Sequence, residues 1–127
     1  MSEIIYKDLC YVLNGIFFYI HNKLGPNCSE KQYQEGVALK LSADNIFYER
    51  EKKLFIKIGN GKVGGNQVDF LVESKLPVDL KAKKYITRED FKQMLRYLKA
   101  GNYRLGLIVN FRGLKVQIKR VVNSDLH

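Results

Sequence analysis

Two aspartates, Asp69 and Asp79, lie in neighbouring runs of the sequence that alternate between polar and apolar residues. From 68 to 82 the even positions are apolar except for Ser74 in the middle, while most odd positions are polar or charged. This period of two predicts two short strands that pair around a turn at Ser74. One face of the hairpin would then join the core and the other would carry the polar chemistry. A turn that is symmetric about Ser74 places Asp69 directly opposite Asp79.

Two carboxylates in this position favour a metal ion. Opposed side chains on paired strands have Cβ atoms about 5 Å apart, and like charges there are destabilising unless a cation intervenes. Mg²⁺ and Mn²⁺ take one or two carboxylates together with water and phosphate oxygens. We therefore predict that Asp69 and Asp79 bind Mg²⁺ or Mn²⁺, with Lys81 on the same face and within reach of a phosphate. The alternative is a solvent-facing hairpin with only a weak ion pair between Asp79 and Lys81.

The elements that must position these residues follow from the apolar periodicity and the turn signals. Helices are expected where apolar residues recur every 3.6 positions, and strands where they alternate or form a short buried run. The predicted order is ααβββαββ, over residues 5–20, 29–43, 46–58, 67–73, 76–82, 87 to a C′ residue at Gly101, 105–111 and 115–122. Asn27 or Ser29 is the expected N-cap of the second helix, Asn60-Gly61 closes a hairpin, and Gly64-Gly65 marks a bulge. The length fits one domain over residues 1–127, with an α/β fold.

Positive charge is concentrated in the second half of the chain. The formal net charge is +9, and residues 75–120 hold thirteen Lys or Arg against three acids. Such a surface suits a phosphate backbone or an anionic membrane, although it is also found on proteins that are simply soluble. The longest apolar stretch, Tyr11 to Ile20, is too short to span a membrane. The acidic start of the chain lacks a secretory signal, so we expect a cytoplasmic protein without a membrane partner.

The order of the motifs resembles that of a known nuclease superfamily. A helix with a carboxylate, a strand with Asp, a turn, a strand reading Asp-x-Lys, a further helix and a strand are similar to the PD-(D/E)XK nuclease superfamily. More narrowly, the chain resembles the GxxExxY protein family within it. The stretches that carry the resemblance are residues 24–33, 68–72, 78–82, 93–98 and 106–111.

The resemblance implies a restriction-endonuclease-like core, a mixed β-sheet flanked by helices, and metal-dependent hydrolysis of phosphodiester bonds in DNA or RNA. Asp69 and Asp79 would be metal ligands and Glu30 an additional acidic ligand. Lys81 would activate or position water, and Gln93 would line the site. The expected catalytic set is therefore Glu30, Asp69, Asp79, Lys81 and Gln93.

Two of these residues have purely structural interpretations. With Asn27 as N-cap, Glu30 would be the N3 residue of a capping box, a role that is compatible with metal binding because one oxygen suffices for the cap. Gln93 is spaced four residues before Tyr97, clear of the apolar side of its helix. It is equally well explained as a solvated surface residue.

A basic stripe on the third helix and the segment before it is the expected contact for a nucleic-acid backbone. Its members are Lys83, Lys84, Arg88, Lys92, Arg96 and Lys99. A solvated helix face is the alternative. Two other functions compete with the nuclease: a non-catalytic nucleic-acid-binding module with a nuclease-like fold, and a structural partner of another protein. The oligomeric state is left open, and a homodimer would supply two active sites for cutting a duplex.

Overall fold

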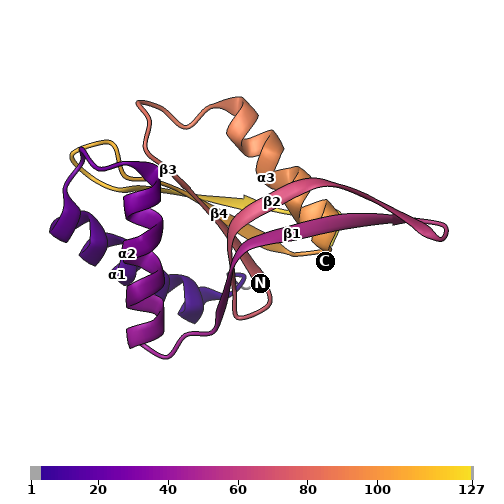
Figure 1. Cartoon of the computed structure of the whole chain (residues 1–127), viewed down its shortest axis with the longest axis horizontal. Helices are drawn as coiled ribbons and strands as arrows, with labels where there is room; N and C mark the ends of the chain where they lie inside the picture. The colour runs from indigo at the N-terminus through magenta and orange to yellow at the C-terminus, as the bar shows by residue number, and fades with distance from the viewer. Residues whose placement is uncertain (1–3, 127) are drawn as a thin grey trace.

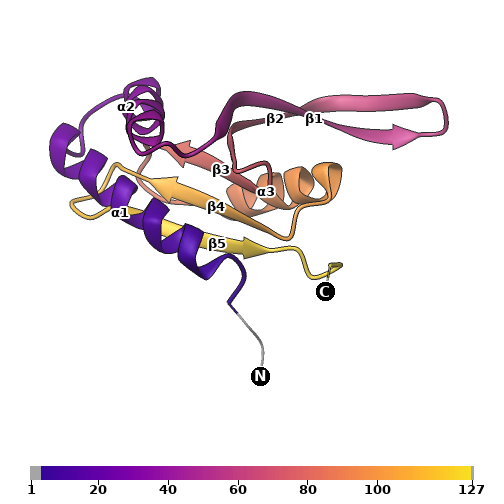
Figure 2. The same cartoon turned by 90° about the horizontal axis from the view of Figure 1, so that it is seen from below.

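A mixed five-stranded sheet with helices on both faces forms the protein (Figures 1 and 2). The computed structural model describes residues 4–126, so the acidic start of the chain and the last residue lie outside the described part. The order ααβββαββ is confirmed. The elements are α1 Lys7–Leu24, α2 Glu30–Ala43, β1 Tyr48–Ile58, β2 Gly61–Val72, β3 Leu76–Lys81, α3 Arg88–Gly101, β4 Leu105–Asn110 and β5 Gln117–Val122.

The strands lie side by side in chain order, from β1 at one edge to β5 at the other. Each neighbouring pair is antiparallel except β3 and β4, which are parallel. Parallel strands need a long crossover, and α3 supplies it between them. Figure 2 shows this arrangement, in which the carboxyl ends of β3 and β4 come to the same edge of the sheet. This edge is where Lys81 and the segment after it lie.

Each face of the sheet has its own core. The helices α1 and α2 cover one face, where Tyr33 stacks on Phe111 with ring centroids 4.4 Å apart. The helix α3 covers the other face with Met94 and Leu98. The β2–β3 hairpin was alternatively expected to face solvent with its polar side, and this is wrong. The amphipathic helix α3 buries its apolar side against this face of the sheet. Within residues 4–126, no helix has the length and apolarity needed to cross a membrane.

Helix ends differ from the predictions in two places. Ser29 is the N-cap of α2 and forms its capping box with Gln32, so the capping box of Asn27 with Glu30 is wrong. Glu30 is the first residue of the helix and its carboxylate is left for other contacts. At the end of α3 the left-handed residue is Asn102, not Gly101. A side chain at Gly101 would collide with the ring of Tyr103, which is the reason for a glycine there.

The strands β1 and β2 form a hairpin that is much longer than the other strands and projects beyond the rest of the sheet (Figure 1). Ile58 pairs with Gly61, so Gly59 and Asn60 make the two-residue turn. The register shifts between Leu54 and Ile56, opposite Gly64-Gly65, and Gly65 has a φ of 96°. The predicted hairpin and bulge are both confirmed, but the turn lies one residue earlier than the predicted Asn60-Gly61. The strand predicted to start at residue 67 begins at Gly61, because residues 61–66 continue the pairing with β1.

Candidate functional site

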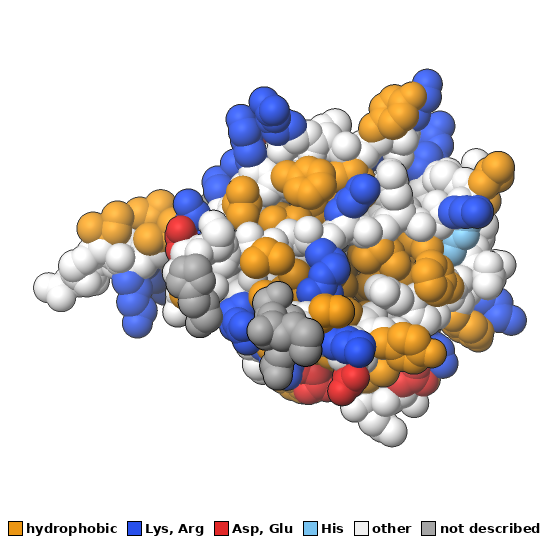
Figure 3. Space-filling model, turned by 180° about the vertical axis from the view of Figure 1, so that it is seen from behind, with side chains coloured by type: hydrophobic (Ala, Val, Ile, Leu, Met, Phe, Trp, Pro, Cys, Tyr) orange, Lys and Arg blue, Asp and Glu red, His pale blue; other side chains and the backbone are white. Residues whose placement is uncertain are grey.

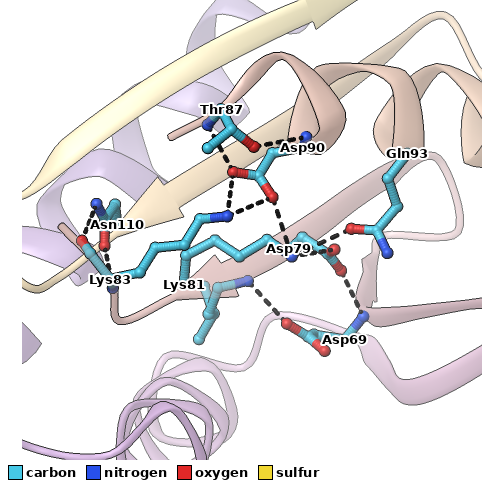
Figure 4. Close-up of polar contacts among 9 residues, drawn as sticks. Asp69, Asp79, Lys81, Lys83, Thr87, Asp90, Gln93 and Asn110 are labelled. Atoms are coloured by element: carbon cyan, nitrogen blue, oxygen red, sulfur yellow. Dashed lines mark hydrogen bonds and ion pairs between the residues drawn. The ribbon is translucent and has the colours of Figure 1, made fainter. Parts of the chain in front are cut away.

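The hairpin of β2 and β3 brings Asp69 and Asp79 together as predicted. Phe70 pairs with Val78, and Val72 pairs with Leu76, which is the register of a turn symmetric about Ser74. The backbone N–H of Asp69 donates to Oδ1 of Asp79 at 3.0 Å. In return, the N–H of Leu80 donates to Oδ2 of Asp69 at 2.8 Å. Each carboxylate is thus fixed by the backbone of the opposite strand (Figure 4).

The carboxyl groups of Asp69 and Asp79 both have raised pKa values. Asp79 is only 5% exposed, and burial raises its pKa above the ordinary value even though the Asp69 N–H and Lys81 oppose this. Burial, followed by the charge of Asp79, raises the pKa of Asp69 to about 7. Desolvation and a neighbouring like charge both favour the protonated form of a carboxyl group. The pair is therefore costly to keep ionised, and the charge of Lys81 offsets only part of this cost.

Lys81 lies at the centre of the polar contacts in Figure 4. Its Nζ donates to Oε1 of Gln93 at 3.1 Å, and lies 3.5 Å from Oδ2 of Asp79 and 3.9 Å from Oδ1 of Asp90. The ammonium group is thus held between β3 and α3 by one hydrogen bond and two ion pairs. The sequence prediction placed Gln93 at the site, and the structure brings it there. Its interpretation as a solvated surface residue is wrong, since its side-chain oxygen is used by Lys81.

Two polar residues of this network were not predicted as site residues. Asp90 is 7% exposed; it binds Lys83 Nζ at 2.6 Å and caps α3 with Thr87, whose N–H donates to Asp90 at 2.7 Å. Burial alone would raise the pKa of Asp90, but the hydrogen bonds from Lys83 and Thr87 outweigh it and hold the pKa below the ordinary value. Asn110, at the end of β4, exchanges two hydrogen bonds with the backbone of Lys83. Together they fix the segment that follows the Asp-x-Lys strand.

Glu30 lies near this cluster although it comes from α2. Burial raises the pKa of Glu30, and the charges that act on it include those of Lys81, Asp79 and Asp90. The residue as a whole is exposed, so its carboxyl group is only partly shielded from water. Among residues 4–126, no three His, Cys, Asp or Glu side chains converge on a common point as a ready metal-binding group. The assembled carboxylate pair is Asp69 with Asp79, and Glu30 lies at its margin.

Tyr97 closes the site from α3, one turn after Gln93. The sequence places it clear of the apolar side of the helix, yet it is only 5% exposed and belongs to the core beneath the sheet. Burial raises the pKa of Tyr97, and the negative charges of Asp79 and Asp69 raise it further. Tyr33, by contrast, stays in the other core, where its hydroxyl contacts the backbone of Gly25 and Cys28.

Most of the predicted basic stripe is exposed, but part of its charge is neutralised. The α3 members Arg88, Lys92, Arg96 and Lys99 are all exposed. Lys92 pairs with Glu89 at 3.6 Å, and Lys99 pairs with Asp125 at 3.8 Å. Lys83 is committed to Asp90, while Lys84 lies over the ring of Tyr85. The pairs of Lys92 and Lys99, which join exposed side chains, are weak enough to be exchanged for phosphate contacts, whereas Lys83 is bound to the buried Asp90.

Comparison with known proteins gives two findings. The family profile of the PD-(D/E)XK nuclease superfamily matches residues 7–121. A solved structure, an alkaline exonuclease (LHK-Exo) from Laribacter hongkongensis, is similar with a TM-score of 0.54 at 12% sequence identity. The similarity covers 98% of this chain and 73% of the exonuclease chain, and at this identity it shows a shared fold. A comparison with curated proteins finds no match.

Proposed function

The chain belongs to the PD-(D/E)XK nuclease superfamily, and from this premise we propose that it is a divalent-metal-dependent nuclease. The observation that carries the proposal is the pair of opposed carboxylates of Asp69 and Asp79, held by reciprocal backbone hydrogen bonds beside Lys81. The structural neighbour is an alkaline exonuclease, which supports the same class of reaction. The predicted reaction is hydrolysis of a phosphodiester bond in DNA or RNA.

The donor set fits a hard divalent cation such as Mg²⁺ or Mn²⁺. Each aspartate uses one oxygen for a backbone N–H of the opposite strand. The other two oxygens, Asp69 Oδ1 and Asp79 Oδ2, would hold the ion, and Asp79 Oδ2 would share its charge with Lys81 Nζ, which lies 3.5 Å away. Two carboxylate oxygens plus water and phosphate oxygens are the ligands that Mg²⁺ prefers, and no thiol or imidazole belongs to the set. We propose Glu30 as the third, marginal carboxylate. When bound, the ion would supply Lewis-acid polarisation of the phosphate and a water of lowered pKa.

The residues of the chain itself have distinct proposed roles. Asp69 and Asp79 would hold the ion, while Lys81 Nζ stabilises negative charge as it builds on the phosphate oxygens or positions the attacking water. Gln93 and Asp90 are positioning residues, because they act through Lys81. The exposed Lys84, Arg88 and Arg96, together with Lys83, Lys92 and Lys99, track the nucleic-acid backbone.

A cleavage assay with labelled DNA and RNA tests the proposal. We expect the wild-type protein to shorten at least one substrate with Mg²⁺ or Mn²⁺ and to be inactive with a chelator. Asp79→Asn should lose at least about a hundredfold in rate, because an oxygen ligand and the local charge are removed together. Asp44→Asn is the matched control, since it makes the same chemical change at an exposed end of α2.

Equal rates for wild type and Asp79→Asn would remove the assignment. The alternative, a non-catalytic module, is distinguished by nucleic-acid binding that is insensitive to chelator and leaves every substrate intact. A covalently closed circular substrate separates the two modes of cleavage, because only an endonuclease cuts it.

Two finer proposals concern identity and assembly. We propose that the chain is a member of the GxxExxY family, because its motifs occur in that family's order from Leu24 to Phe111. We also propose a homodimer on duplex substrates, since one site cuts one strand. Sedimentation with and without a duplex checks the second proposal, and a strictly monomeric complex that cuts both strands would contradict it.

A further inference from the structure

The β1–β2 arm, which we define as residues 53–67, carries positive charge that the rest of the molecule does not compensate. Residues 52–68 include four lysines and no acid. Lys52 lies at the base and pairs with Glu49 at 2.8 Å. Within residues 4–126, no ion pair is formed by the other three, Lys53, Lys57 and Lys62. The arm is therefore a cationic projection from the body of the protein.

Two of these lysines face each other across the ribbon. Lys57 and Lys62 are direct partners in the register of β1 and β2. Like charges in this position are destabilising, so the pair favours an anion between or beside its ammonium groups. Lys62 Nζ also lies 4.3 Å from the centroid of the Phe55 ring, which places the aromatic residue on the same face. The ring packs on Gly64, where a Cβ would come within 3.1 Å of it.

The same face continues into a hollow of about 370 Å³ next to the base of the arm. Its lining combines one ammonium group, one aromatic ring and two side-chain amides, from Lys53, Phe55, Gly65, Asn66 and Gln67. The opposite face of the arm differs, because it exposes apolar side chains of Ile56, Ile58 and Val63. Figure 3 shows the arm at the left, with hydrophobic side chains along its upper edge and basic side chains below them. The three unpaired lysines of the arm, Lys53, Lys57 and Lys62, thus share one face.

We propose that the basic face of the arm binds double-stranded DNA beside the Asp69–Asp79 site. Lysines on the ribbon contact phosphates and fix the position of the duplex, and the amide of Gln67, the cross-strand partner of Lys53, faces the base edges. A two-stranded ribbon fits the major groove of B-form DNA, which is about 12 Å wide. The major groove of A-form RNA is too narrow for it. The proposal rests on the proposed nuclease function for the position of the cleaved bond.

The reach of the arm sets the length of DNA that it requires. Asp69 and the first residue of β2, Gly61, lie on the same strand. Their eight-residue separation spans at most about 27 Å at the usual rise of a strand. This length corresponds to about eight base pairs at 3.4 Å each. We therefore expect the tip of the arm to contact the duplex about eight base pairs from the bond at the Asp69–Asp79 site.

Binding measured without metal tests the arm independently of catalysis. The probe is a fluorescent DNA duplex of about 30 base pairs, titrated in EDTA at several salt concentrations and followed by anisotropy. The variant Lys57→Gln/Lys62→Gln removes two phosphate contacts. We expect its Kd to rise roughly tenfold or more near 0.1 M salt, and the slope of log K against log salt to fall by about 1.8. Shortening the flank below about eight base pairs should remove the difference between wild type and variant.

The control Lys7→Gln/Lys119→Gln removes the same charge from the exposed surface of α1 and β5, and should leave the wild-type slope nearly unchanged. The proposal would be overturned if the arm variant bound the duplex with the wild-type Kd. It would also be overturned if Lys7→Gln/Lys119→Gln lost as much affinity and salt slope as the arm variant. An equal loss of affinity for single-stranded DNA or for an RNA duplex would also overturn it. If the arm variant loses duplex binding but the wild type never cleaves, the arm stands and the nuclease function fails. If the arm variant binds and cleaves the duplex as wild type does, the nuclease function stands and the arm proposal fails.

Discussion

Replacing Asp69 by Asn should stabilise the metal-free protein, and should do so only above acidic pH. The carboxyl group of Asp69 has an ordinary pKa of 3.8 in the unfolded chain and a pKa of about 7 in the folded protein, because of burial and the adjacent charge of Asp79. Below the unfolded pKa the group is protonated in both states and costs nothing. As pH rises toward about 7, the unfolded chain releases its proton and the folded protein does not, so stability is lost over this window.

The magnitude follows from the two pKa values. Their difference corresponds to about 4 kcal/mol, and the partial exposure of Asp69 reduces the expected effect to about 2 to 3 kcal/mol. Asp69→Asn removes the ionisable group but keeps an oxygen that accepts the Leu80 N–H. The free energy of unfolding of the variant, relative to wild type, should therefore rise by this amount between about pH 4 and pH 8.

Urea unfolding in EDTA at a series of pH values measures the difference directly. Asp44→Asn, an exposed and distant control, should show no such trend. Adding Mn²⁺ at saturating concentration should reverse the order at neutral pH, because only wild type gains stability from binding the ion. A difference between Asp69→Asn and wild type that stays constant with pH would refute the reasoning, since the two carboxylates would then not oppose each other's ionisation.

Three further results are expected. Gln93→Leu should lower kcat about tenfold with little change in KM, measured by initial rates, because Lys81 loses its acceptor at 3.1 Å and not its charge. Asp90→Ala should cost about 1 to 3 kcal/mol of unfolding free energy, measured in urea, because it removes the N3 half of the α3 capping box and the acceptor of Lys83. Gly106→Ala should cost about 1 to 3 kcal/mol in the same assay, because its methyl group would collide with buried Met94, and an unchanged midpoint would contradict the packing.

Much of the site was predictable because its central feature is local. The hairpin of β2 and β3 needs only a period of two and a turn at Ser74, so the sequence alone predicts which residues face each other. The structure confirms this register. The same locality made the element order predictable, since each helix and strand has its own periodicity and its own turn signals. Asp69, Asp79 and Lys81 were thus placed from pattern alone.

The contacts that support the site were harder to predict because they join distant residues. Asn110 fixes the backbone of Lys83 across 27 positions, and no local pattern in the sequence relates them. Asp90 did carry a signal, since Thr87-x-x-Asp90 at the start of a predicted helix has the spacing of a capping box. Its second role, as the acceptor for Lys83, depends on how α3 docks on the sheet.

Glu30 shows how one misplaced cap changes an interpretation. Two N-cap candidates, Asn27 and Ser29, precede α2, and the choice between them decides whether Glu30 caps the helix. Ser29 is the cap and Gln32 is its partner, so the carboxylate of Glu30 is free of a structural role at the helix end. The projection of the β1–β2 arm was not predicted, because alternation predicts the strands of a hairpin but does not show where the neighbouring strands of the sheet end.

Calorimetric titration of the metal-free protein with Mn²⁺ tests the central claim most directly. We predict that one Mn²⁺ binds to each wild-type chain, that binding is lost in both Asp69→Asn and Asp79→Asn, and that it is retained in Glu89→Gln, an exposed acid on α3. The same isotherm for wild type and for either aspartate variant would contradict the claim that the two opposed carboxylates hold an ion.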